Sequence, residues 1–466
     1  MADTRREADS LGEWHLPADV LYGVHTARAV ANFPITGTRL CDYPEIVQSL
    51  GMVKKAAVLA NMELGAIEPR LGQAILRACD RVISGEADAA FVVDMIQGGA
   101  GTSTNMNANE VIANLALREL QRPPGQYDLI HPNDHVNASQ STNDAYPSAM
   151  RLTMVRMCPA LVTELRSLKA AFLAKGVEFH DIIKVGRTQL MDAVPMRLGD
   201  EFRAFGVTIG EDIDRLTEVG NLLREINLGG TAIGTGINTP AGYGAAVIKH
   251  LSAVSGERVA AAGDLIEATS DMGAFVMFSG VLKRVAVKLS KICNDLRLLN
   301  SGPRAGFGEI KLPAMQAGSS IMPGKVNPVM PEVMNQIAFQ VIGNDLTVTM
   351  AAESGQLQLN AMEPVIVFNI LQSMRMLTRG MAVLREKCIY GIEADAARCK
   401  FLLEHSLVAV TAINPFVGYA KASAVAKEAL ASGQSVRSIV LAKGLMTEAQ
   451  LDEAFTTENL LGQTGR

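Results

Sequence analysis

Residues 197–227 read RLGDEFRAFGVTIGEDIDRLTEVGNLLREIN, and this stretch decides the fold class. Its apolar side chains recur every three or four residues, at Leu198, Phe202, Phe205, Ile209, Ile213, Leu216, Val219, Leu223 and Ile226. Apolar residues at this spacing line one face of an α-helix. At about 1.5 Å per residue, a helix over the whole stretch is about 45 Å long.

Four further stretches have comparable length and period, at residues 146–178, 264–299, 328–352 and 363–389. Five helices of this length can bury their apolar stripes together only as a bundle. Helices this long often also bury a face against other subunits, so we expect a homo-oligomer. The sequence contains no strand-rich block, and the fold class we predict is mainly all-α.

The composition is that of a large globular protein. Of the 466 residues, 48% are hydrophobic and 20% are charged, and the length suggests about three domains. We expect a mostly helical N-terminal domain over 1–140, a central five-helix bundle over 141–397 and a small helical C-terminal domain over 398–466. The net charge of −5 argues against a large basic surface for nucleic acid.

Cysteine usage and the N-terminus point to a reducing compartment. The six cysteines form no CxxC pair, which predicts reduced thiols and neither a zinc site nor a disulfide framework. Residues 1–9 carry charges of both signs and no apolar core of a signal peptide, and no apolar run is long enough to cross a membrane. We therefore expect a cytoplasmic protein without membrane contact.

Three polar segments lie between the predicted helices, at residues 97–107, 137–144 and 318–328. Each is dense in Ser, Thr and Asn and leads into a predicted helix. A helix cap needs only one such residue, although three good caps remain an alternative interpretation. Uncharged donors at helix N-termini favour bound anions, and three such clusters could hold two carboxylates.

Two other kinds of site are disfavoured. Gly324-Lys325 suggests a phosphate loop, but Ser319 stands where that motif needs glycine and Val326 follows the lysine. His131 and His135 have the spacing of a metal pair, but the proline between them argues against a regular helix. We expect no metal and no cofactor.

The segment Gly318-Ser-Ser-Ile-Met-Pro-Gly-Lys-Val-Asn-Pro328 resembles the signature loop of the aspartase/fumarase superfamily. Other segments fit the same superfamily from Gly12 to about Leu460: residues 101–107 (GTSTNMN), 139–144 (SQSTND), 186–190 (GRTQL) and 228–232 (LGGTA), with Leu359-Asn360 and Glu363-Pro364. Within it, Tyr22-Gly-Val-His-Thr26 and Ser141-Thr-Asn-Asp-Ala-Tyr146 are similar to the aspartate ammonia-lyases. At Gln189, fumarases and some aspartases have histidine, whereas other aspartases have glutamine.

The resemblance implies a three-domain fold with a central five-helix bundle and a homotetramer. Each active site would combine segments of three subunits. The implied reaction is the reversible deamination of L-aspartate to fumarate and ammonia, through an aci-carboxylate intermediate. Two alternatives stay open: a class II-type fumarase that hydrates fumarate to malate, and a catalytically silent family member with a structural role.

The resemblance also implies roles for individual residues. Ser319 would be the general base, and the cationic Lys325 would stabilise its alkoxide. Three sets would bind the substrate: Thr102, Ser141, Thr142 and Ser320 at the β-carboxylate; Thr188, Lys325 and Asn327 at the α-carboxylate; and Asn143, with Thr102 and Gln189, at the amino group. The resemblance places Ser319, Lys325 and Thr188 in the catalytic set.

Overall fold

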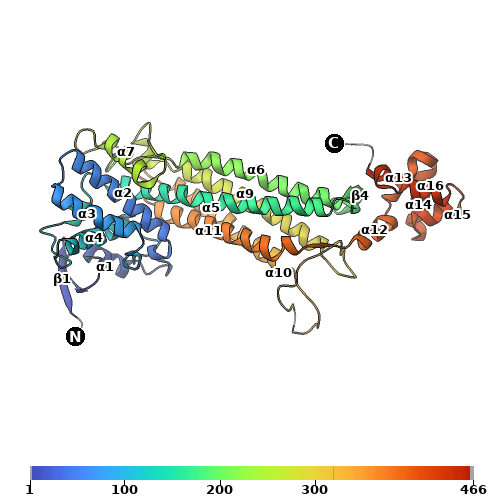
Figure 1. Cartoon of the computed structure of the whole chain (residues 1–466), viewed down its shortest axis with the longest axis horizontal. Coiled ribbons are helices and arrows are strands. Elements are labelled where there is room, and N and C mark those ends of the chain that lie inside the picture. The colour runs from blue at the N-terminus through green and yellow to red at the C-terminus, as the bar shows by residue number, and fades with distance from the viewer. Residues whose placement is uncertain (1–2, 319, 462–466) are drawn as a thin grey trace. The chain divides into compact units, whose positions relative to one another are not determined.

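The computed structural model describes residues 3–318 and 320–461 and is mostly helical (Figure 1). The chain forms two compact units. Unit 1 comprises Met1–Val162, Asp214–Arg284 and Gln340–Met376, and unit 2 comprises Thr163–Ile213, Val285–Phe339 and Leu377–Arg466. The mainly all-α fold class predicted from the sequence is confirmed.

Five helices of the described chain have 25 residues or more, and each contributes a segment to both units. They are α5 (Thr142–Glu178), α6 (Leu198–Leu222), α9 (Gly273–Leu299), α10 (Val329–Glu353) and α11 (Glu363–Lys387). These are the five helices that the apolar period predicts.

Two predicted helix boundaries are wrong. The helix expected over 197–227 ends at Leu222, because Glu225–Ile226 (β5) pairs in parallel with Ala260–Ala261 (β6). The helix expected over 264–299 is broken into α8 (Glu267–Ser270) and α9. Asp271 causes this break, since its Oδ2 accepts a hydrogen bond from the Gly273 N–H (2.8 Å) and starts a new helix.

In unit 1, shorter elements accompany the long helices. Helix α2 packs on α3 and α7, and α3 packs on α4. The bounds are β1 (Thr4–Asp9), β2 (Gly12–Pro17), α1 (Val24–Asn32), η1 (Leu40–Asp42), α2 (Pro44–Glu63), α3 (Pro69–Ile83), η2 (Asp88–Ala90), α4 (Thr102–Glu119), η3 (Pro132–Val136) and α7 (Tyr243–Ser255).

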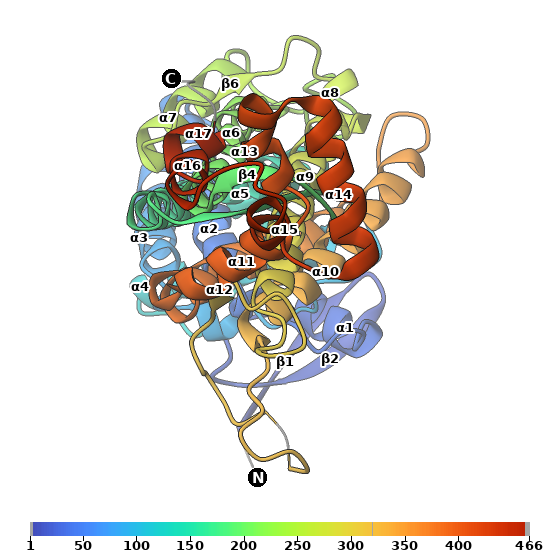
Figure 2. The same ribbon diagram turned by 90° about the vertical axis from the view of Figure 1, so that its right-hand side faces the viewer.

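In unit 2, the antiparallel hairpin of β3 (Ile183–Thr188) and β4 (Met191–Arg197) packs on α12 (Ala396–His405). Four helices, seen together in Figure 2, share a small apolar core that includes Ile413, Val425, Val436 and Leu451. They are α13 (Ala409–Val417), α14 (Tyr419–Ser432), α15 (Val436–Ala442) and α16 (Glu448–Ala454). The remaining elements are β7 (Ile310–Lys311), η4 (Ile389–Gly391), β8 (Glu393–Ala394) and α17 (Thr457–Leu461).

Within each unit, polar and aromatic side chains join the long helices across their packed faces. In unit 1, Asn344 of α10 donates to the Ser373 hydroxyl of α11 (3.0 Å), and Ser279 of α9 donates to Asp345 of α10 (2.8 Å). In unit 2, Phe172 of α5 packs edge-on against Phe205 of α6, with ring centroids 5.7 Å apart. These contacts give each unit its own part of the predicted helical bundle.

The three-domain boundaries near residues 140 and 398 stay a prediction. No helix in the described part of the chain combines the length and the apolarity needed to cross a membrane.

Candidate active site

The first polar segment turns sharply into α4. Gly101 has φ of 88°, and a Cβ there would lie 2.5 Å from the Tyr146 ring, so both the backbone conformation and the space require glycine. Thr102 follows as the first residue of α4 and is exposed. Its hydroxyl donates to the Gly99 carbonyl (2.7 Å), so the Thr102 oxygen presents acceptor lone pairs in this conformation.

The second segment starts α5 with reciprocal capping bonds. Ser141 Oγ accepts from the Asn143 N–H (3.2 Å), and Asp144 Oδ1 accepts from the Ser141 N–H (2.9 Å). Asp144 is fully buried, and its Oδ2 also accepts from the N–H groups of Gly229 and Thr231, each at 3.0 Å. This carboxylate therefore ties the 228–232 segment to the start of α5.

The hydroxyls of Ser141 and Thr142 each have a defined direction of hydrogen bonding. We call the side on which such a group donates or accepts its polarity. Thr142 Oγ1 accepts from Asn105 Nδ2 (3.2 Å), just as Ser141 Oγ accepts from a backbone N–H. Because the oxygens are engaged from inside the protein, the hydroxyl protons can be donated outward. Both residues are half-buried at the N-terminus of α5, where the helix dipole also favours an anion.

Asn143 has the opposite polarity. Its Nδ2 donates to the Ala232 carbonyl (2.7 Å), which fixes the amide with Oδ1 directed away from that carbonyl. No group in the described ranges 3–318 and 320–461 donates a hydrogen bond to this Oδ1. Adjacent residues of one helix start thus offer donors at 141 and 142 and an acceptor at 143.

In unit 2, Thr188 and Gln189 are exposed at the tip of the β3–β4 hairpin. The two-residue turn has φ of 55° at Gln189 and 64° at Leu190. Both values lie in the left-handed region, which residues other than glycine seldom occupy. The hairpin is anchored by Glu309, a buried carboxylate whose oxygens lie 2.8 Å from the Arg187 guanidinium and 3.0 Å from the Lys184 ammonium.

The 318–328 loop closes on itself at its base. Asn327 Nδ2 donates to the Gly318 carbonyl (3.0 Å), and a Cβ at Gly318 would overlap the Lys325 carbonyl oxygen. Ser320 and Lys325 are exposed, and Lys325 makes no ion pair with any described residue. The predicted base Ser319 lies outside the described residues.

The predicted site residues fall into two groups. Unit 1 brings together the segments that carry Thr102, Ser141, Thr142 and Asn143, since Asn105 of α4 contacts Thr142 of α5. Unit 2 carries Thr188, Gln189, Ser320, Lys325 and Asn327.

Sequence reasoning missed the residues that support these segments. Lys54 of α2 is fully buried and donates to Asn105 Oδ1 (2.6 Å), Asn137 Oδ1 (2.9 Å) and Gln140 Oε1 (2.9 Å). Burial lowers the pKa of Lys54 to about 7, against the opposing effect of the buried Asp144 carboxylate. The only signal in the sequence is a lysine at an apolar position of an otherwise ordinary helix.

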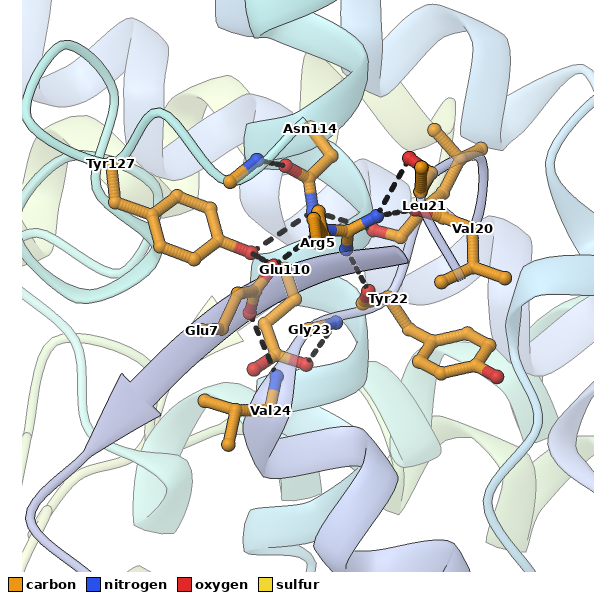
Figure 3. A network of polar contacts seen from close by, with 12 residues as sticks. Arg5, Glu7, Val20, Leu21, Tyr22, Gly23, Val24, Glu110, Asn114 and Tyr127 are labelled. Atoms are coloured by element: carbon orange, nitrogen blue, oxygen red, sulfur yellow. Dashed lines mark hydrogen bonds and ion pairs between the residues drawn. The ribbon is translucent and has the colours of Figure 1, made fainter. Parts of the chain in front are cut away.

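Two buried carboxylates, Glu7 and Glu110, hold the Tyr22–Thr26 stretch, and Figure 3 shows them beside Gly23 and Val24. Glu110 Oε2 accepts from the Gly23 N–H (2.8 Å) and from the N–H and hydroxyl of Thr26 (3.1 and 2.6 Å), while Glu7 Oε2 accepts from the Val24 N–H (2.9 Å). These carboxylates satisfy the free N–H groups at the start of α1. Burial raises the pKa of Glu110, and the hydrogen bonds oppose that shift.

His131 and His135 lie in one local turn. His131 Nδ1 accepts from the Asn133 N–H (3.2 Å), and His135 Nδ1 accepts from the His131 N–H (2.8 Å). Burial lowers the pKa of His135. Among the described residues, no three His, Cys, Asp or Glu side chains are grouped as a metal site would need.

Comparison with known protein families places the chain. Residues 12–343 match the family described as "Lyase", and residues 410–462 match the family described as "Fumarase C C-terminus". The chain belongs to this lyase family. The resemblance to the aspartase/fumarase superfamily that the motifs predict is confirmed.

Members of the lyase family with high similarity include proteins named aspartate ammonia-lyase. One from Pseudomonas fluorescens is 58% identical over 99% of this chain and 96% of its own length, and one from Escherichia coli (strain K12) is 53% identical over 98% and 96%. Among solved structures, a fumarate lyase:delta crystallin from Brucella melitensis bound to cobalt superposes with a TM-score of 0.94, at 58% identity over 97% of this chain and 98% of its own. A class II fumarase from Schistosoma mansoni has a TM-score of 0.91 at 33% identity, over 97% and 98%.

Proposed function

We propose that this chain is an aspartate ammonia-lyase, a carbon–nitrogen lyase that interconverts L-aspartate with fumarate and ammonia. The observation that carries the proposal is the polarity of Asn143. An amide oxygen left free beside outward hydroxyl donors suits a substrate that has an ammonium group next to its carboxylates. The hydroxyl of malate could donate to the same oxygen, so the ammonium-dependent assay described below separates the two activities. The names of the relatives in the lyase family support the same activity.

Ser141 and Thr142 would stabilise the transition state. Removal of the C3 proton leaves charge on the β-carboxylate, which becomes an aci-carboxylate. Preorganised donors placed where charge develops typically contribute more to such catalysis than any other effect. Two hydroxyl donors at the N-terminus of α5 supply this at the β-carboxylate, and we assign Ser320 to the same group; Thr102 joins them only when its hydroxyl turns from the Gly99 carbonyl toward the substrate. The oxygen of Thr102, as a free acceptor, also suits the amino group.

The remaining roles follow the superfamily pattern. Ser319 takes the C3 proton as an alkoxide stabilised by Lys325. The C3 electron pair then forms the C2=C3 double bond while the C2–N bond breaks. Lys325, Thr188 and Asn327 hold the α-carboxylate, and Gln189 assists Asn143 at the amino group.

The assembly is part of the proposal. Two observations support an oligomer: the apolar stripe Phe339, Leu346 and Met350 on α10 is exposed in the isolated chain, and so are Leu190 and Met191 at the hairpin tip. We propose a cytoplasmic homotetramer whose sites take segments from three subunits. Light scattering coupled to size-exclusion chromatography measures the mass directly, and a stable monomer would contradict this arrangement.

An absorbance assay tests the activity. Purified protein is incubated with fumarate, with and without ammonium, and fumarate absorbance is followed. We expect loss of absorbance only with ammonium, with aspartate as the product. Loss without ammonium would instead identify a fumarase.

Ser319→Ala tests the base in the same assay. We expect at least about a 1,000-fold loss of kcat, because both the base and its alkoxide are removed. Ser432→Ala, at the exposed end of α14, is the matched control for a serine-to-alanine change, and it should keep the wild-type kcat. Equal losses in both variants would contradict the assignment of Ser319.

A further inference from the structure

Lys54 is a buried lysine that, in its protonated form, contacts the described part of the proposed site through three neutral amides. Its three hydrogen bonds go to Asn105, Asn137 and Gln140, and three acceptors match the three protons of an ammonium group. Asn105 lies in the first polar segment, and Asn137 and Gln140 lie in the second. One lysine of α2 therefore joins the two segments that carry Thr102 and Thr142.

The three amides are locked in one orientation. Each NH2 group is engaged elsewhere: Asn137 Nδ2 donates to the Gln140 carbonyl (3.3 Å), Gln140 Nε2 to the Val136 carbonyl (3.0 Å), and Asn105 Nδ2 to Thr142 Oγ1 (3.2 Å) and Asn137 Oδ1 (3.1 Å). Rotating any of these amides would place an NH2 group against the Lys54 ammonium. The cation therefore fixes which atom of Asn105 faces Thr142.

The orientation of Asn105 decides what the Thr142 hydroxyl can do. With the NH2 group facing it, the Thr142 oxygen can only accept on that side, and its proton is free for another acceptor. With a carbonyl or carboxylate oxygen facing it, Thr142 would donate inward and present lone pairs to an anion. A hydroxyl that presents lone pairs repels a carboxylate.

We propose that Lys54 and Asn105 are positioning residues that force the Thr142 hydroxyl to donate toward a substrate carboxylate. The inference rests on the proposed function for the identity of that carboxylate. Lys54 touches no substrate. It acts through the fixed amide of Asn105: the ammonium orients this amide, and the amide orients the Thr142 hydroxyl. We call these two contacts the relay.

Asn105→Asp tests the relay with little change of shape. The new carboxylate gives Lys54 a charged partner, so we expect the variant to fold. It also replaces the NH2 donor by an acceptor, which turns the Thr142 hydroxyl inward. The probe is succinate, which is aspartate without its amino group, and calorimetry on the full-length protein measures its dissociation constant.

We expect Asn105→Asp to weaken succinate binding by about 10- to 100-fold, the loss of one hydrogen bond to a charged group. In a Thr142→Val background the same change should have little further effect, because the hydroxyl is already gone. Lys54→Met should also weaken succinate binding, and it too should have little further effect in the Thr142→Val background. Lys55→Met is the matched control, since this neighbouring lysine pairs with Asp80 (2.5 Å) outside the network, and it should bind succinate normally.

Two results would overturn the relay: unchanged succinate binding by Asn105→Asp, or an equally large effect with and without the Thr142 hydroxyl. The second result would indicate a general charge or folding effect. Wild-type protein that binds succinate but forms no fumarate from aspartate would contradict the proposed function, while the calorimetric comparison would still decide the relay.

Discussion

The polarity of Asn143 makes a prediction that separates recognition of the amino group from recognition of the carboxylates. In Asn143→Ala, the protein loses the free Oδ1 acceptor and the hydrogen bond to the Ala232 carbonyl. Aspartate carries an ammonium group and succinate does not, but both carry two carboxylates. The variant should therefore discriminate against aspartate alone.

The structure bounds the size of the effect. A hydrogen bond to a charged group contributes about 1.5–3 kcal/mol, so kcat/KM for aspartate should fall about 10- to 150-fold. Loss of the neutral bond to Ala232 costs about 0.5–1.5 kcal/mol and affects both ligands equally. Asp144 still holds the neighbouring N–H groups of Gly229 and Thr231, so the 228–232 segment stays anchored.

The assay compares kcat/KM for aspartate with the inhibition constant of succinate in the same preparation. Thr142→Val is the control, because it removes a carboxylate donor and should weaken succinate binding as well as aspartate turnover. We expect kcat/KM for aspartate to fall in both variants, and the inhibition constant of succinate to rise by more than a few-fold only in Thr142→Val. If succinate binding falls as much as aspartate turnover in Asn143→Ala, Asn143 does not recognise the amino group.

Three further variants test the supporting structure. Glu110→Ala leaves three buried donors without an acceptor, so urea unfolding should show a loss of at least about 3 kcal/mol, and a loss below about 1 kcal/mol would contradict this. Burial raises the pKa of Glu363 from 4.5 to about 8, so the folded chain keeps a proton that the unfolded chain loses. The stability of Glu363→Gln relative to wild type should therefore rise by about 1.4 kcal/mol per pH unit from pH 6 to 8 and level off above it, and a flat difference would refute the shift. Gly318→Ala should lower kcat/KM more than about 10-fold without a large change in melting temperature, because the added Cβ would meet the Lys325 carbonyl in an exposed loop; unchanged turnover would show that the loop base tolerates it.

The sequence predicted the helical fold because long apolar stripes have one physical solution. Residues 197–227 and the four similar stretches must pack together, and their period of three to four residues specifies helices. The helix ends were less predictable. The hydrogen bond from Gly273 to Asp271 is local and could have been found, but the end of α6 depends on the pairing of β5 with β6, which are 35 residues apart.

The sequence also identified the kinds of residue at the site, because Ser, Thr and Asn are concentrated in segments that precede helices. It could not determine which way their hydrogen bonds point. That direction depends on partners far along the chain, such as Ala232 for Asn143 and Lys54 for the amides of Asn105 and Gln140. A hydroxyl or amide can donate or accept, and only the tertiary structure, by engaging one side of each group from within, decides which side is left for a ligand.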